Sequence, residues 1–213
     1  MSALRFSSLI ILFPILFGAC GRSELIRIRM LAPVTEDKKD HAIFTDTTSS
    51  SSFTPTITNK NVGGSLYFLF KSIGLGYTTI TTKIEKADEK LTEKTTLVTN
   101  FADVAFGIGE NYTFMWGAGV LTGGKWETSL EYNSETFNPK HNYLGGHSLF
   151  FVLGHHGFGF ETLLGYRTNS IKAEFDESNI PSNMGKTDKE FTYESNKISL
   201  TTSQVQLGIG FTF

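Results

Sequence analysis

Strict alternation of apolar and polar residues is the dominant pattern of this chain, and it is most regular at the end. One face of the final extended segment is apolar and consists of Val205, Leu207, Ile209, Phe211 and Phe213. The residues between them are Gln206, Gly208, Gly210 and Thr212, which fall on the opposite face because side chains alternate along a strand. An apolar outer face with a small, polar inner face is typical of a strand that separates lipid from a polar lumen.

The same alternation predicts further strands upstream. The expected strands cover residues 24–32, 62–70, 73–85, 95–108, 112–132, 143–153, 158–167 and 198–213. Tight connections are expected at 71–72, 109–111 and 154–157, and long polar connections at 33–61, 86–94, 133–142 and 174–197. Short and long connections therefore alternate, as the periplasmic turns and extracellular loops of outer-membrane barrels do. We predict an all-β fold, an eight-stranded antiparallel up-and-down transmembrane β-barrel.

The longest predicted strand, 112–132, carries both tryptophans. Trp116 and Trp126 share a face under strict alternation, and they are separated by about 33 Å of strand. After a tilt of about 40° this becomes about 25 Å, which is the spacing of two aromatic girdles. An alternative is a hairpin at Thr122-Gly123-Gly124-Lys125, since Gly-Gly is a good turn signal. In that case 24–32 is not a strand, and 21–61 is a flexible periplasmic leader.

The N-terminal residues have the features of a signal peptide. Arg5 precedes an apolar run over 9–17, and the small residues Gly18 and Ala19 follow. The run is shorter than the roughly 20 residues of a membrane-spanning helix. We therefore expect residues 1–19 to be cleaved and 20–213 to form a single barrel domain. Cys20 is the only cysteine, so no internal disulfide is expected. It is a candidate for lipidation, and ordinary cleavage nearby is the alternative.

Composition agrees with a barrel and excludes some other classes. The chain has 21 glycines and 13% aromatic residues, as strands with small inward residues and aromatic girdles require. A net charge of -2 provides no electrostatic footprint for nucleic acid. No cofactor is expected.

Two segments and the overall plan carry a family resemblance. The final strand with its terminal Phe213 resembles the C-terminal β-signal of bacterial outer-membrane proteins, which implies recognition by the outer-membrane assembly machinery. Residues 16–20 resemble a relaxed lipobox, in which Phe17 departs from the preferred Leu. The plan from about residue 24 to 213 resembles small outer-membrane proteins of the OmpA, OmpX and OmpW kind. The resemblance implies a place in the bacterial outer membrane and roles ranging from surface adhesion to passage of small hydrophobic molecules.

The predicted inward face carries charges. They are Arg27, Arg29, Asp103, Glu127, Glu161 and Arg167. An eight-stranded barrel is just wide enough for side chains to fill, and charges buried there must be paired. We therefore expect a salt-bridged plug, with a narrow polar path for a small solute as the alternative. The expected role is structural or surface-interacting.

Catalysis and metal binding are not expected. A lipid A-modifying barrel needs its base and nucleophile on one face, but His147 and Ser148 are adjacent and so face opposite sides. His155, His156 and Glu161 lack a compact metal-ligand spacing.

The long connections are the other candidate site. Those over 34–61 and 174–197 are charged and rich in Ser and Thr, so we expect any contact with an extracellular macromolecule there. The barrel itself is expected to contact outer-membrane lipid. A different class to weigh is a lipid-anchored, lipocalin-like soluble carrier, in which the aromatic face would point inward.

Overall fold

The computed structural model describes residues 26–34, 43–47, 56–157, 159–176, 180–186, 192–194 and 197–213. The predicted signal peptide at 1–19 and the lipidation candidate Cys20 lie outside the described residues. No helix among the described residues is long and apolar enough to cross a membrane.

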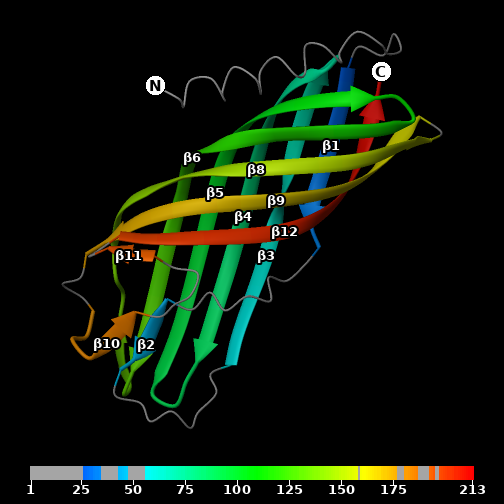
Figure 1. Cartoon of the computed structure of the whole chain (residues 1–213). Helices are drawn as coiled ribbons and strands as arrows, with labels where there is room; N and C mark the ends of the chain where they lie inside the picture. Colours follow the sequence, from blue (N-terminus) through cyan, green and yellow to red (C-terminus); the bar gives the residue numbers. More distant parts are fainter. Residues whose placement is uncertain are drawn as a thin grey trace, which may run out of the picture.

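Eight long strands form a closed antiparallel barrel (Figure 1). They are β1 (Ile26–Pro33), β3 (Thr56–Phe70), β4 (Ile73–Ala87), β5 (Leu91–Gly109), β6 (Tyr112–Tyr132), β8 (His141–Gly157), β9 (Phe160–Phe175) and β12 (Lys197–Thr212). Each strand pairs with the next one named, and β1 pairs with β12 to close the barrel. The predicted fold class is confirmed.

Four short strands among the described residues lie at one end of the barrel. They are β2 (Phe44–Asp46), β7 (Glu135–Phe137), β10 (Met184–Lys186) and β11 (Thr192–Glu194). β2 and β10 pair with each other in a separate two-stranded sheet, whereas β7 and β11 extend β6 and β12.

The alternating sequence produces an apolar belt around the outside of the barrel. Exposed members of the belt include Met30, Phe68, Leu75, Tyr77, Val104, Phe114, Val120, Leu149, Phe151, Leu164, Leu207, Ile209 and Phe211. On β4 the outward positions between Ile73 and Lys83 are Leu75, Tyr77, Thr79 and Thr81, none of them charged. The stretch from Ile73 to Lys83 covers about 33 Å of strand, or about 25 Å along the axis at a tilt of about 40°. That height matches the lipid-facing band of outer-membrane barrels.

Connection lengths differ from the sequence-based expectation at two places. The expected long loop at 86–94 is mostly strand, because β4 and β5 pair as far as Ala87 and Thr92 and leave only residues 88–90 between them. Buried Ile84 and Leu91 keep the alternation on the inner face after the outer face has become polar. The expected turn at 154–157 belongs to β8, which continues to Gly157.

A β-bulge in β6 changes which residues face inward. Asn100 pairs with Gly123, whereas the next residue, Phe101, pairs with Leu121, so Thr122 is an extra residue. One inserted residue moves all later side chains to the other face of the strand, because the side-chain period is two. Residues 112–132 are nevertheless one strand, so the hairpin alternative is wrong.

The end of the barrel that carries the short strands consists of two facing sheets. Pairing between β6 and β8 stops at Val120 and His147, although β6 continues to Tyr132. β1 likewise stops at Pro33, whereas β3 and β12 continue beyond it. In Figure 1, β8, β9 and β12 cross β3, β4 and β5 at a large angle.

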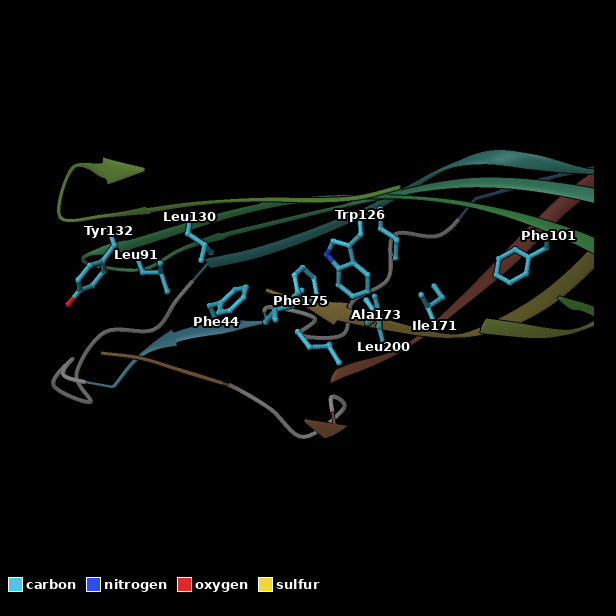
Figure 2. Packing of buried hydrophobic residues seen from close by; sticks show 13 residues of the cluster. Phe44, Leu91, Phe101, Trp126, Leu130, Tyr132, Ile171, Ala173, Phe175 and Leu200 are labelled. Atoms are coloured by element: carbon cyan, nitrogen blue, oxygen red, sulfur yellow. The ribbon is translucent and has the colours of Figure 1, made fainter. Parts of the chain in front are cut away.

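An apolar core fills the space between the two sheets. Its buried members are Ile43, Phe44, Leu91, Leu97, Phe101, Trp126, Leu130, Tyr132, Ile171, Ala173, Phe175, Ile198 and Leu200. Figure 2 shows Trp126 on one sheet above Phe175, Ala173 and Leu200 on the other side of the core, and the Trp126 and Phe175 rings meet edge to face at 5.4 Å. We refer to this set as the extracellular core.

Candidate functional site

Arg167 on β9 lies at the centre of the lumen and is fully buried. Its Nη1 and Nη2 donate to the two carboxylate oxygens of Asp103 on β5, each at 2.9 Å. Two parallel charge-assisted bonds of this kind fix both the distance and the orientation of the pair.

Neutral partners complete the shell around Arg167. Its guanidinium also donates to Tyr67 on β3, Thr78 on β4, Ser148 on β8 and Asn169 on β9 itself. The rings of Phe101 and Phe150 lie 4.9 Å and 5.3 Å from the guanidinium carbon. The network therefore joins five strands across the lumen, and it satisfies a charge that would be costly to bury alone.

Gly119 on β6 makes room for this pair. A Cβ at that position would lie 1.9 Å from Oδ1 of Asp103 and 2.7 Å from the Ser148 hydroxyl oxygen. Any larger residue must displace the carboxylate, so a glycine is required by close approach at this position.

A second buried ion pair closes the lumen nearer the tight turns. Arg29 on β1 donates through Nε and Nη2 to Glu161 on β9, at 2.7 Å and 2.9 Å, and Nη2 also donates to Thr113 at 2.8 Å. Arg27 donates to the carbonyl of Gly109 at 2.9 Å. Between this pair and the central pair lies a small apolar cluster made of Leu31, Tyr67, Leu69, Ala105, Met115, Phe150, Val152 and Leu163.

The strand β2 is fastened over the opposite end of the lumen. The backbone N–H groups of Ile43 and Phe44 donate to Oε2 of Glu93, at 2.9 Å and 3.0 Å, and Nζ of Lys86 donates to the Phe44 carbonyl at 2.7 Å. Lys86 and Glu93 are direct cross-strand neighbours on β4 and β5, and both are buried. We call residues 43–47, with these two anchors, the cap.

Burial has an electrostatic consequence in the cap. Glu93 lies beyond the apolar belt, and desolvation raises the pKa of its carboxyl to about 7, although hydrogen bonds from Phe44 and Ile43 oppose the shift. Glu93 therefore titrates near neutral pH.

The predicted inward charges divide into two groups. Arg27, Arg29, Asp103, Glu161 and Arg167 lie inside the barrel. The expectation for Glu127 is wrong: it points outward and pairs with Lys125 at 2.6 Å, with both side chains largely exposed. On β6, the Asp103 partner Gly119 lies before the bulge at Thr122 and Glu127 lies after it. The bulge therefore reverses the face of the strand on which Glu127 lies.

The same bulge overturns the girdle prediction for Trp126. Trp116 is half-buried on the outer face, where it stacks on Phe114 at 5.4 Å. Trp126 is only 1% exposed and belongs to the extracellular core. The predicted assembly-signal residues Leu207, Ile209, Phe211 and Phe213 are exposed, and Val205 is half-buried.

The histidines considered for chemistry do not converge. His147 is exposed on the outer face, whereas Ser148 is buried and hydrogen-bonded to Arg167. His155 is exposed and packs against Tyr112 with ring centroids 5.0 Å apart. Within the described ranges, no group of three His, Cys, Asp or Glu side chains could hold a metal ion.

Sequence reasoning missed the cap anchors and the neutral partners of Arg167. Lys86 and Glu93 had a detectable signal, because they share an inner face with Ile84 and with Leu91 and Leu97 respectively. This inner-face pattern was overlooked because residues 86–94 were interpreted as a loop. The hydroxyl and amide partners of Arg167 carry no signal of their own in one sequence.

The sequence matches no protein-family model and no curated protein. Among solved structures, it is similar to the outer membrane protein OprG from Pseudomonas aeruginosa, with 13% identity and a TM-score of 0.42 over 91% of this chain and 98% of that one. It is also similar to Neisserial surface protein A (NspA), with 11% identity and a TM-score of 0.44 over 88% of this chain and 97% of that one. The barrel assignment rests on the strand pairing of this chain itself.

A closed antiparallel barrel leaves no unpaired strand edge within its belt, and this outer surface is apolar over the height of a bilayer core. Barrels of this form are the transmembrane proteins of bacterial outer membranes. The chain therefore folds as a small, eight-stranded transmembrane β-barrel of the outer-membrane type.

Proposed function

We propose that this protein is a non-conducting barrel with a structural and surface-interaction role, whose lumen is closed by its own side chains. The observation that carries the proposal is the Arg167–Asp103 network. Five strands contribute partners to one guanidinium, so polar side chains occupy the middle of the lumen.

Two further layers support a closed lumen. The Arg29–Glu161 pair lies toward the tight turns, and the extracellular core lies on the other side of Arg167. An ion crossing the barrel would have to break buried ion pairs and also cross an apolar layer. Both steps are unfavourable, because charges lose solvation in such an environment.

We propose that the surface role resides at the end of the barrel that carries the cap. There the two facing sheets project beyond the apolar belt, β2 is fastened to Lys86 and Glu93, and β2 pairs with β10. A rigid scaffold with connections at its end is a common way to present a binding surface, so we propose contact with an extracellular macromolecule there. The outer-membrane assembly machinery is the proposed partner of β12, and outer-membrane lipid that of the belt. No catalytic step is proposed.

Single-channel recording in planar bilayers tests the proposal. The refolded wild-type barrel is expected to give no steady ohmic current, under conditions in which an open porin, added as an incorporation control, does. A reproducible wild-type conductance that changes in Arg167→Ala and Asp103→Asn would contradict the plug and favour the narrow-pore alternative.

A further inference from the structure

Lys60 on β3 and Lys83 on β4 are direct cross-strand partners, and both are exposed on the outer surface of the barrel. Like charges in directly opposed positions destabilise a strand pair. Among the described residues neither lysine takes part in an ion pair, whereas Lys125 and Lys197 are both paired with glutamates. Within the described protein, neither ammonium group is therefore neutralised by a direct ion pair.

The position of this pair relative to the apolar belt suggests the missing partner. From Lys60 toward the tight turn, the outward positions of β3 are Val62, Gly64, Leu66, Phe68 and Phe70, and the four apolar side chains among them are exposed. From Lys83 toward the tight turn, those of β4 are the half-buried Thr81 and Thr79, followed by Tyr77 and Leu75, which are 53% and 68% exposed. The lysines are the first charged residues beyond the apolar part of both strands, on the side away from the tight turns.

The depth of the lysines is that of lipid headgroups. Lys83 lies ten positions after Ile73 on β4, which corresponds to about 25 Å along the barrel axis at a tilt of about 40°. A lipid whose acyl chains lie along Val62, Leu66 and Tyr77 would place its headgroup at Lys60 and Lys83. Ammonium groups bind phosphate as point charges, and basic residues beside a membrane surface attract anionic headgroups.

We propose that Lys60 and Lys83 form a binding site for a phosphate group of the outer-leaflet lipid, with the apolar outer face of β3 and β4 as the seat of its acyl chains. The half-buried hydroxyls of Thr81 and Thr96 flank the lysines on the same face. Glu85 follows Lys83 on the same face and lies directly opposite Lys94, so the exposed group Lys60, Lys83, Glu85 and Lys94 keeps a net positive charge.

Native mass spectrometry of the folded protein in a neutral detergent tests this site. The probes are lipid A with two phosphates, the same lipid with both phosphates removed, and inorganic phosphate. The test variant is Lys60→Gln/Lys83→Gln. The matched control is Lys90→Gln/Lys140→Gln, which removes the same charge from exposed positions in the connections before β5 and β8. Heat-modifiable migration of each variant establishes that it is folded.

The test variant is expected to bind diphosphorylated lipid A at least about tenfold more weakly than wild type. The reason is that each lysine near an anionic membrane surface contributes to the free energy of binding. The control variant should bind it like wild type, and the dephosphorylated lipid should bind all three proteins equally. Equal lipid binding by the test variant and wild type would overturn the proposal, as would an equal loss in the control. Displacement of the lipid by millimolar inorganic phosphate would also overturn it, because the site would then recognise a free anion rather than a lipid.

Discussion

Trp116 and Trp126 lie on the same strand, β6, yet their side chains are on opposite sides of the barrel wall. An even spacing along an ideal strand would place them on one face. The extra residue Thr122 reverses the alternation between them. As a result, one tryptophan contacts Phe114 on the lipid-facing surface and the other packs against Phe175 inside the molecule.

The two tryptophans can be distinguished by lipid-borne quenchers. Because the chain has only two tryptophans, Trp126→Phe leaves Trp116 as the sole indole, and Trp116→Phe leaves Trp126. In bilayers of brominated lipid, we expect strong quenching of Trp116 and little quenching of Trp126. Equal quenching of both would mean that Thr122 does not act as a bulge and that strict alternation holds.

Breaking the central ion pair should cost much of the stability of the barrel. Arg167→Ala leaves Asp103 buried without its counter-charge, and removing one partner of a buried pair typically costs about 3–5 kcal/mol. The free energy of unfolding in urea, measured in detergent micelles, checks this. Glu127→Ala is the matched control, because it breaks the exposed pair with Lys125 and should cost at most about 1 kcal/mol. Similar losses in both variants would show that the buried network is not specially stabilising.

Gly119→Ala tests the close packing around Asp103. The added Cβ would lie 1.9 Å from the carboxylate oxygen, so the Arg167–Asp103 pair must shift, and we expect a lower unfolding temperature. Gly123→Ala on the same strand is the control, since its Cβ would meet only Asn100, at 3.8 Å. A thermal melt followed by loss of heat-modifiable protein measures both. No effect of Gly119→Ala would contradict the tight fit of this pair.

The cap should be more stable in acid than in mild base. Burial raises the pKa of Glu93 to about 7 from an ordinary value of 4.5. Between these two values the folded state binds a proton that the unfolded state does not, so the stabilising effect is complete below pH 4.5 and declines as pH rises through 7. The change is on the order of 1–3 kcal/mol.

Hydrogen exchange at the amides of Ile43 and Phe44 reports on the cap. After correction for the intrinsic pH dependence of exchange, we expect protection to fall between pH 5 and pH 8. Glu93→Gln retains an acceptor oxygen but does not titrate, so its protection should be flat over this range. A wild-type profile as flat as that of the variant would exclude Glu93 as the titrating group.

Phe213 is expected to matter for assembly through its side chain as well as its backbone. Its N–H donates to the Ile26 carbonyl at 2.9 Å, and its carbonyl accepts from the Ile26 N–H at 3.2 Å, so the residue helps to close β12 against β1. Deleting Phe213 removes these bonds and the ring, whereas Phe213→Ala removes only the ring. If the ring is read during assembly, both variants should yield less heat-modifiable protein in the outer membrane. Normal levels for Phe213→Ala, with loss only in the deletion, would assign the effect to barrel closure.

The sequence by itself determined the barrel, because a period of two along a strand assigns each residue to one of two faces without reference to any other strand. Alternation located all eight strands, and the apolar outer face of β12 was correct throughout. It also placed Arg29, Asp103, Glu161 and Arg167 inside. It did not show that Arg29 pairs with Glu161 and Arg167 with Asp103.

Only the tertiary structure decided the pairing, the bulge and the cap. Arg167 finds Asp103 across the lumen because of the register and tilt of strands that are distant in sequence. Thr122 is accommodated as an extra residue because β5 continues its own alternation beside it. The extra residue reverses the alternation of β6, so Trp126 lies inside and Glu127 outside, contrary to the sequence-based prediction. Lys86 and Glu93 are buried because β2 covers them. Each of these features depends on contacts between separate segments, and a local period carries no information about such contacts.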